Sequence, residues 1–251
     1  RADAIDVLIT PANDAPTLST APALSLSQVE DDAVPSAAVG TLVSSLTSGI
    51  TDLDTGAVKG IAITAAVQTN GTWYYSTDNG STWTTLGAPS TAASLLLADD
   101  GATRLYFKPN ANLNGTQTGI LTLRAWDRST GTNGTTANTT TTGTTTPFST
   151  TTDTVDVVVA AVNDAPAFSL LDGVAAYSEG GTTAVLDSNV TVLDAELSAS
   201  GNYAGATLTL NRSGGASAQD VFVATGTLGA LTQGTALIVG GTTIGTVTTN
   251  S

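Results

Sequence analysis

The stretch "DTVDVVVAAVNDAP" at residues 153–166 decides the fold, because it joins a strand pattern to a stiff turn. Its apolar residues alternate, as is typical of a β-strand with one buried face. In the turn that follows, Asn and Asp side chains can bond to their own backbone, and Pro fixes its own φ angle. This combination indicates a place where one β-domain ends and the next begins.

The same pattern occurs 150 residues earlier, as "DAIDVLITPANDAP" at residues 3–16. Seven residues of the earlier copy are identical to their counterparts at this offset: Asp3, Asp6, Val7, Asn13, Asp14, Ala15 and Pro16. The repeat predicts three parts. They are a closing strand of an upstream repeat (1–12), a complete β-sandwich repeat (13–163), and a second repeat that is incomplete at its C-terminal end (164–251).

A sandwich without its last strand has an open edge, and two explanations of the second repeat stay open. The chain is either a segment of a longer polypeptide, or a subunit in which residues 3–10 of one copy complete the second repeat of another by strand addition. We favour the longer polypeptide.

Short runs of Val, Ile, Leu and Thr separated by Gly, Asn, Asp and Pro favour an all-β sandwich fold throughout the chain. The strands that we expect lie at residues 5–10, 60–67, 103–109, 119–127, 154–162, 206–212 and 236–249. Residues 129–154 are rich in Thr and contain few apolar residues, so we expect a long loop on the surface.

The composition excludes several classes of function. With 21 acidic residues against 7 basic ones, the net charge of −14 argues against nucleic acid and anionic lipid as partners. The absence of Cys and His excludes disulfides, thiolate nucleophiles and a Ser-His-Asp triad. No run of about 18 apolar residues is present, so we expect no membrane insertion.

The turn "AAVNDAPAF" (160–168) resembles the linkers between cadherin-like repeats in giant bacterial surface adhesins of the RTX type, which are exported by type I secretion. The segment "YFKPNANLNGTQTGILTLRAWD" (106–127) is similar to another part of these repeats. The resemblance implies tandem Ig-like (cadherin-like) β-sandwich domains in an extended string, an extracellular location at the bacterial cell surface, and calcium between the domains.

The acidic residues also point to calcium by their own chemistry. They form two matching sets with the Asn-Asp turns: Asn13, Asp14, Glu30, Asp52 and Asp54, then Asn163, Asp164, Glu179, Asp194 and Glu196. Each set contains an acid-x-acid pair, whose side chains can converge on one cation at a strand end. Calcium binds about 6–8 oxygen ligands of these kinds. The alternative is that Asn and Asp cap the turns and the other acids are solvated.

The stretch "YSTDNGSTW" (75–83) has the pattern of an Asp-box, known from sialidase propellers. We interpret it as a hairpin turn in which Asp78 accepts backbone hydrogen bonds and Gly80 adopts a positive φ. Nearby, Trp73, Tyr75 and Trp83 could form an exposed stacking platform for glycans. The alternative, which we favour, is that this face belongs to the core.

These observations predict a structural segment of a repetitive adhesin or cell-surface fibre, with roles in cell adhesion and biofilm formation and no enzymatic activity. The expected partners are neighbouring repeats or further copies of the chain, together with surface glycans or other cells. The alternatives are a glycan-binding module and a filament subunit assembled by strand exchange.

Overall fold

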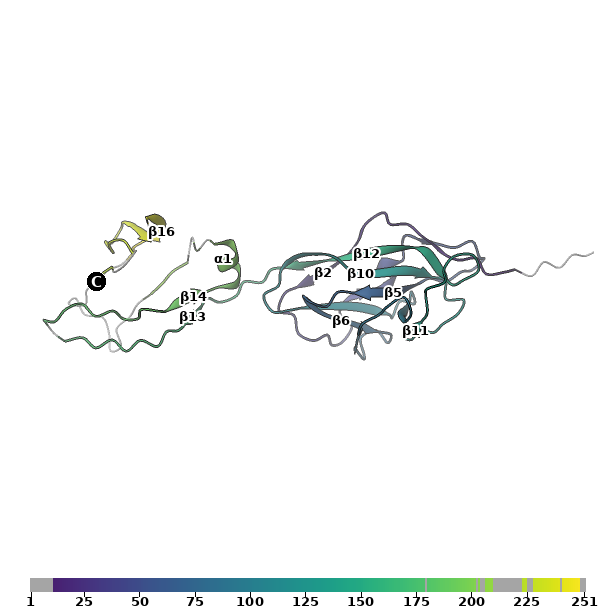
Figure 1. Cartoon of the computed structure of the whole chain (residues 1–251), viewed down its shortest axis with the longest axis horizontal. Coiled ribbons are helices and arrows are strands. Elements are labelled where there is room, and N and C mark those ends of the chain that lie inside the picture. Colours follow the sequence, from purple (N-terminus) through teal and green to yellow (C-terminus); the bar gives the residue numbers. More distant parts are fainter. Residues whose placement is uncertain are drawn as a thin grey trace, which may run out of the picture. The chain divides into compact units, whose positions relative to one another are not determined.

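The computed structural model describes residues 11–178, 180–201, 203, 206–209, 223–224, 228–239 and 241–248. The chain divides into two compact units, Arg1–Val162 and Asn163–Ser251, and Figure 1 shows strands in both. This boundary lies one residue before the predicted one. The predicted strand at residues 5–10, within the closing strand expected at 1–12, lies outside the described residues.

The larger sheet of unit 1 has six strands. Their order is β11 (Thr136–Ala137), β8 (Ser94–Ala98), β5 (Gly60–Ala66), β10 (Gly115–Trp126), β12 (Phe148–Ala160) and β2 (Leu24–Val29). Neighbouring strands are antiparallel, except that β12 and β2 are parallel. The quoted strand pattern therefore forms an interior strand of this sheet, because β12 pairs on both of its sides.

The second sheet of unit 1 has four strands. Their order is β3 (Thr41–Leu42), β9 (Arg104–Pro109), β6 (Gly71–Ser76) and β7 (Thr84–Thr85). A short pair, β1 (Thr17–Leu18) with β4 (Ile50–Thr51), and a 3-10 helix at Val43–Leu46 complete the unit. The predicted strands at 60–67, 103–109, 119–127 and 154–162 correspond to β5, β9, β10 and β12.

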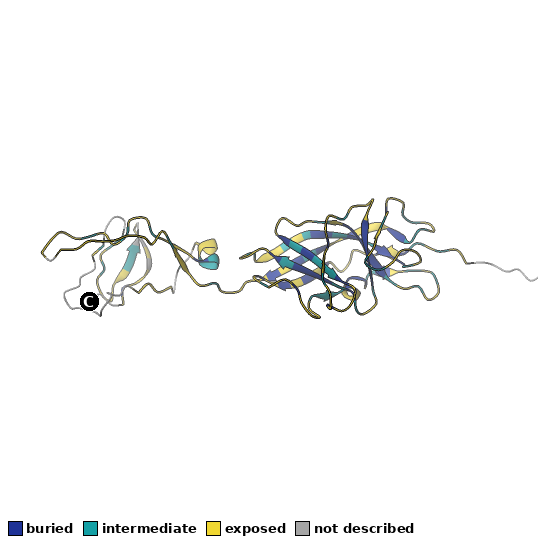
Figure 2. Cartoon of the chain, turned by 90° about the horizontal axis from the view of Figure 1, so that it is seen from below, coloured by how far each residue is buried: buried dark blue, intermediate teal, exposed yellow. Residues whose placement is uncertain are grey.

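The hydrophobic core of unit 1 lies between its two sheets. The four-stranded sheet contributes Trp73 and Phe107, whose ring centroids lie 4.9 Å apart. The six-stranded sheet contributes apolar side chains that alternate along its strands, such as Val155, Val157 and Val159 of β12. Figure 2 shows these strands as the buried part of the chain.

The Thr-rich segment differs from the predicted surface loop. Residues 148–154 belong to β12, and β11 pairs with β8 at the end of the larger sheet. The segment covers a second apolar cluster that includes Leu96, Trp126 and Phe148. Trp126 Nε1 donates to the Thr130 carbonyl over 2.8 Å, and Thr139 is fully buried. Hydroxyl and backbone hydrogen bonds hold the segment in place, so its low apolar content does not prevent packing.

The described part of unit 2 contains two strand pairs and one short helix. The pairs are β13 (Ala167–Ser169) with β14 (Thr191–Leu193), and β15 (Ala236–Val239) with β16 (Thr242–Thr246). The helix α1 (Ala195–Ser200) was not predicted, although Asp194 caps its start and Gly201 ends it. Residues 206–209 form no strand, so the predicted strand at 206–212 is wrong where it is described.

Candidate functional site

The Asn-Asp turn of unit 1 contacts the acid pair that follows β4. The Asp14 backbone N–H donates to Asp54 Oδ2 over 2.9 Å, and the Asp54 N–H donates to Asp52 Oδ1 over 2.8 Å. The Asn13 side chain donates to the Asp14 carbonyl over 3.2 Å. The pair thus follows a strand end, as predicted, and lies beside the turn that precedes it by about 40 residues.

A third carboxylate, Asp127, joins this turn from the end of β10. Asn13 Nδ2 donates to Asp127 Oδ2 over 2.9 Å, and the Ser129 N–H donates to Asp127 Oδ1 over 2.7 Å. Asp127 is only 5% exposed, so its carboxylate is largely removed from water. Sequence spacing did not group it with Asn13, because the contact joins residues 114 positions apart.

The Asn-Asp turn of unit 2 has the same local arrangement. The Asp164 N–H donates to Glu196 Oε2 over 3.1 Å, and the Asn163 side chain donates to the Asp164 carbonyl over 2.9 Å. Asp194, which is 5% exposed, accepts from the Leu197 N–H as the cap of α1. In both units, therefore, the second acid of the pair accepts the N–H of the turn aspartate. The remaining predicted acid, Glu179, lies outside the described residues.

Glu30 directly follows the last residue of β2. Its carboxylate accepts from the Val162 N–H over 2.7 Å and from Asn114 Nδ2 over 3.1 Å. Only 1% of the residue is exposed. Glu30 therefore binds the last residue of unit 1 and is not brought to the Asp52 and Asp54 pair by any hydrogen bond among the described residues.

The fit of these residues to a cation is mixed. In the described part of the chain, no three Asp or Glu side chains are grouped closely enough to hold a metal ion. However, Asp52 Oδ2 and Glu196 Oε1 are buried carboxylate oxygens without a hydrogen-bond partner. A buried charge without a donor costs free energy, and a cation would remove that cost. One orphaned oxygen belongs to each acid pair.

The Asp-box forms a hairpin turn between β6 and β7, as predicted. Asp78 accepts from the Thr82 hydroxyl over 2.6 Å, from the Thr82 N–H over 2.9 Å and from the Ser76 hydroxyl over 2.7 Å. These hydrogen bonds, the Thr82 hydroxyl foremost, stabilise the carboxylate and lower the pKa of Asp78 to about 2. Gly80 has a φ of +82°.

The Asp-box also contacts a loop that is distant in the sequence, and the sequence analysis did not predict this contact. Trp83 Nε1 donates to the Ala37 carbonyl over 3.1 Å, and the Trp83 ring meets Tyr106 edge-on at 6.0 Å. A Cβ atom at Gly80 would lie 1.9 Å from the Ala37 carbonyl oxygen. The turn therefore packs against the segment between β2 and β3.

The exposed stacking platform, which we did not favour, is not present. Trp73 is fully buried in the core, and Tyr75 is partly buried against the same core. Trp83 is partly buried and is engaged with Ala37 and Tyr106. Trp73, Tyr75 and Trp83 thus do not form an exposed glycan platform, because alternation along β6 turns Trp73 into the core, as we favoured.

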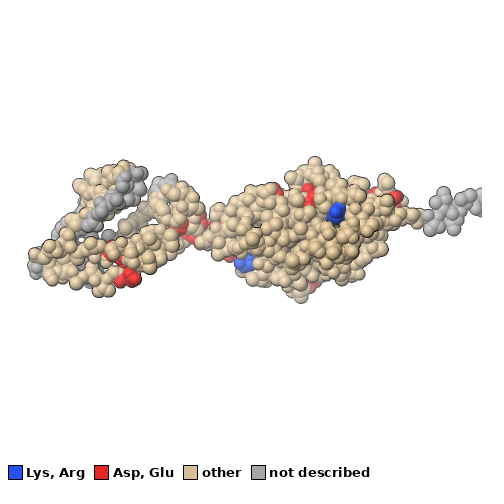
Figure 3. All heavy atoms as spheres, viewed as in Figure 1, with Lys and Arg blue, Asp and Glu red and all other residues tan. Residues whose placement is uncertain are grey.

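Figure 3 shows scattered charged side chains on a mainly uncharged surface in this view. No helix among the described residues is long and apolar enough to cross a membrane.

No protein-family model, curated protein or solved structure matches this chain. By its described strands and sheets, the chain is an all-β protein with several sheets.

Proposed function

We propose that this chain is a structural segment of a repetitive extracellular adhesin or cell-surface fibre, in which calcium stiffens the Asn-Asp turns. The observation that carries the proposal is the hydrogen-bond arrangement shared by the two turns, in which Asp54 and Glu196 play the same role. Recurrence of one turn design in two units supports a tandem architecture of related β-sandwiches. The sequence resemblance to cadherin-like adhesin repeats supports the extracellular and adhesive role.

Calcium is supported by the chemistry of each turn. In unit 1, the residues that would hold it are Asn13, Asp14, Asp52 and Asp54, with Asp127 hydrogen-bonded to Asn13 beside them. Their side chains offer carboxylate and amide oxygens, which are the ligand atoms that calcium prefers. Calcium would neutralise carboxylates that otherwise repel one another, and the Asp52 oxygen without a partner is available for it. In unit 2, Asn163, Asp164, Asp194 and Glu196 form the equivalent set.

The test is a thermal melt in millimolar calcium and then in excess chelator, followed by small-angle scattering in both states. We expect calcium to raise the melting temperature, because a ligand at about 100 times its Kd stabilises the folded state by about 2.7 kcal/mol. The particle should also become longer and stiffer.

The matched variants separate binding from general charge effects. Replacing the pair (Asp52→Asn with Asp54→Asn) should remove most of the calcium-dependent shift in unit 1. Asp156→Asn, at a carboxylate whose contact is the Gly119 N–H of β10, should keep it. An unchanged melting temperature and scattering profile of the parent chain on adding calcium would overturn the calcium part of the proposal.

A second candidate is a filament subunit assembled by strand exchange, and the packing of β12 favours it. In unit 1 this strand lies between β10 and β2 and buries Val155, Val157 and Val159 in the core. At the 150-residue offset, these positions are Ile5, Val7 and Ile9. The described part of unit 2 exposes large apolar side chains, including Leu171, Val174 and Tyr177. A strand with an apolar face would bury such side chains.

Strand exchange predicts association that depends on concentration and on Val7. Light scattering over a hundredfold range of concentration should show growing oligomers, and Val7→Asp should abolish them because it places a charge on the buried face. Val58→Asp, at a residue that is 50% exposed, is the control and should leave association unchanged. A monomer at every concentration would contradict this candidate.

A further inference from the structure

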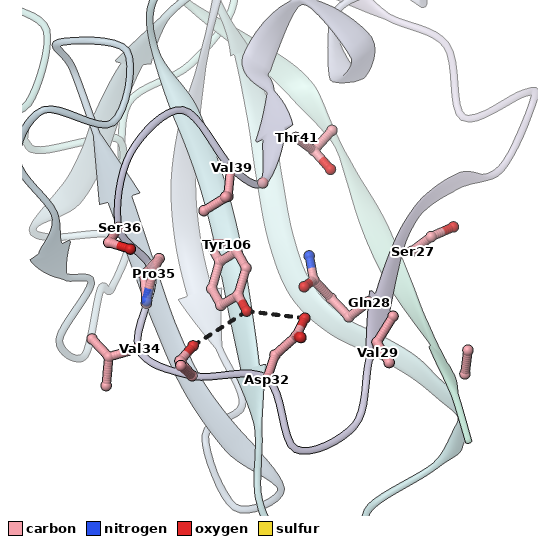
Figure 4. Close-up of a pocket in the computed structure, with 13 residues that line it drawn as sticks. Ser27, Gln28, Val29, Asp32, Val34, Pro35, Ser36, Val39, Thr41 and Tyr106 are labelled. Atoms are coloured by element: carbon pink, nitrogen blue, oxygen red, sulfur yellow. Dashed lines mark hydrogen bonds between the residues drawn. The ribbon is translucent and has the colours of Figure 1, made fainter. Parts of the chain in front are cut away.

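Unit 1 contains a groove beside its two sheet edges, at the loop that joins β2 to β3. Its cavity volume is about 540 Å³, within the range of roughly 300–1,000 Å³ that small-molecule sites occupy. Eleven of its thirteen lining residues come from the single stretch 27–41, and the other two are Tyr106 and Ala160. Figure 4 shows this stretch curving around Tyr106. One continuous chain segment thus forms most of the wall.

Gln28 supplies an unused hydrogen-bonding group to this groove. The residue is only 7% exposed and lines the cavity, yet no hydrogen bond joins its side-chain amide to any described residue. In Figure 4 the amide projects into the space between Tyr106 and Thr41. An amide carries two donor hydrogens and an acceptor oxygen, and those of Gln28 are free to bond within the groove. The amide is therefore set to bind a ligand that both donates and accepts.

Asp32 supplies a second polar group to the groove, its carboxylate. Tyr106 donates its hydroxyl hydrogen to Asp32 Oδ2 over 3.2 Å. Burial, together with the neighbouring Asp32 charge, raises the pKa of Tyr106 to about 12, so the phenol keeps this proton at neutral pH. The geometry leaves the other oxygen of Asp32 without a hydrogen-bond partner among the described residues. Asp32 and Gln28 thus present acceptors and donors to one cavity.

The loop around the groove is held in shape before any ligand binds. Trp83 donates to the Ala37 carbonyl, and Arg104 Nη1 donates to the Gly40 carbonyl over 3.2 Å. Arg104 Nε donates in turn to Asn79 Oδ1 over 2.8 Å, which ties the loop to the Asp-box turn. A wall fixed in this way loses little conformational entropy when a ligand binds.

The charges of the lining residues restrict the class of ligand. No Lys or Arg lines the cavity, and Asp32 is its single carboxylate, so it has no group to balance an anion and too few ligands for a metal ion. Apolar surface comes from Val34, Pro35 and Val39. Apolar walls with neutral hydrogen-bonding groups suit a sugar ring, which has C–H faces and a rim of hydroxyls that donate and accept.

We propose that this groove binds a neutral sugar unit of a glycan, with Gln28 and Asp32 as the groups that bind its hydroxyls. An extended peptide is the competing occupant, because β2 and β3 are both edge strands. The curved wall of residues 32–39 favours a compact ligand, since a peptide strand needs a straight edge that is open at both ends.

The test uses an array of neutral oligosaccharides of glucose, galactose, mannose and N-acetylhexosamines, followed by calorimetry with the best of them. Gln28→Leu should weaken binding at least tenfold. Gln233→Leu makes the same change at an exposed residue of unit 2 and should leave the affinity unchanged. A melt of each variant shows whether it folds.

A second variant keeps the test decisive if Gln28→Leu does not fold. Ser36→Trp places a bulky ring at an exposed position of the wall, and it should block the groove without touching the core. The absence of binding to any neutral glycan would overturn the proposal. So would binding that survives both variants, or binding confined to acidic glycans or to extended peptides.

Discussion

Trp73→Ala is expected to destabilise unit 1 by about 3–5 kcal/mol, the range for truncation of a large buried aromatic side chain. Trp73 is fully buried and packs against Phe107 at 4.9 Å. Its removal leaves a cavity between the two sheets that the neighbouring strands cannot fill. Urea unfolding followed by fluorescence measures this loss, because all three tryptophans of the chain (Trp73, Trp83 and Trp126) lie in unit 1 and two remain in the variant.

Trp73→Phe is the matched control. It keeps an aromatic ring in the core and removes the indole N–H, which is buried without a hydrogen-bond partner. The loss of stability should therefore be much smaller than for Trp73→Ala. If Trp73→Ala unfolded at the same urea concentration as the parent chain, its place in the core would be refuted, and an exposed platform on β6 would be open again.

Gly80→Ala is expected to destabilise unit 1 by about 2–5 kcal/mol, from two costs that act together. The left-handed backbone, with a φ of +82°, disfavours any residue that carries a Cβ atom. That atom would also lie 1.9 Å from the Ala37 carbonyl oxygen, so the Asp-box turn and the loop would have to separate. Urea unfolding with tryptophan fluorescence measures the change.

Gly56→Ala separates these two costs. Gly56 has a similar φ of +80°, but nothing lies within 4 Å of its added Cβ atom. The free energy of unfolding of Gly56→Ala should therefore fall only by the backbone cost, about 1–2 kcal/mol. Equal losses in the two variants would show that the contact between the Asp-box and Ala37 contributes nothing. A larger loss for Gly80→Ala would show that the turn acts as a clamp on the groove loop.

The local signals in the sequence were sufficient for much of unit 1. Alternating apolar residues predicted β5, β9, β10 and β12, because a half-buried strand needs one apolar side chain in every two. The pattern Asp78-Asn79-Gly80 predicted its hairpin turn, since each residue bonds or bends locally. The second Asn-Asp-Ala-Pro turn begins at Asn163, where unit 2 begins.

Local signals failed where contacts between distant residues decide the outcome. The Thr-rich segment 129–154 has a composition typical of an exposed loop, yet part of it covers Leu96 and Trp126 because β8 offers it an edge. The aromatic residues near the Asp-box could be assigned to a surface or to the core, and only the pairing of β6 with β9 decided between them. The contact of Asn13 with Asp127 likewise joins residues 114 positions apart, so no local pattern predicts it.

By itself, the sequence determined the all-β class, the position of the turns and the repeat of the Asn-Asp motif, because these depend on residues a few positions apart. The tertiary structure alone decided which acids meet, as Asp14 and Asp54 do, and where the groove lies. It also gave the Asp-box its second role, as a clamp on Ala37. The physical reason is that strand pairing brings together residues from 40 to more than 100 positions apart, and no local pattern specifies which strands will pair.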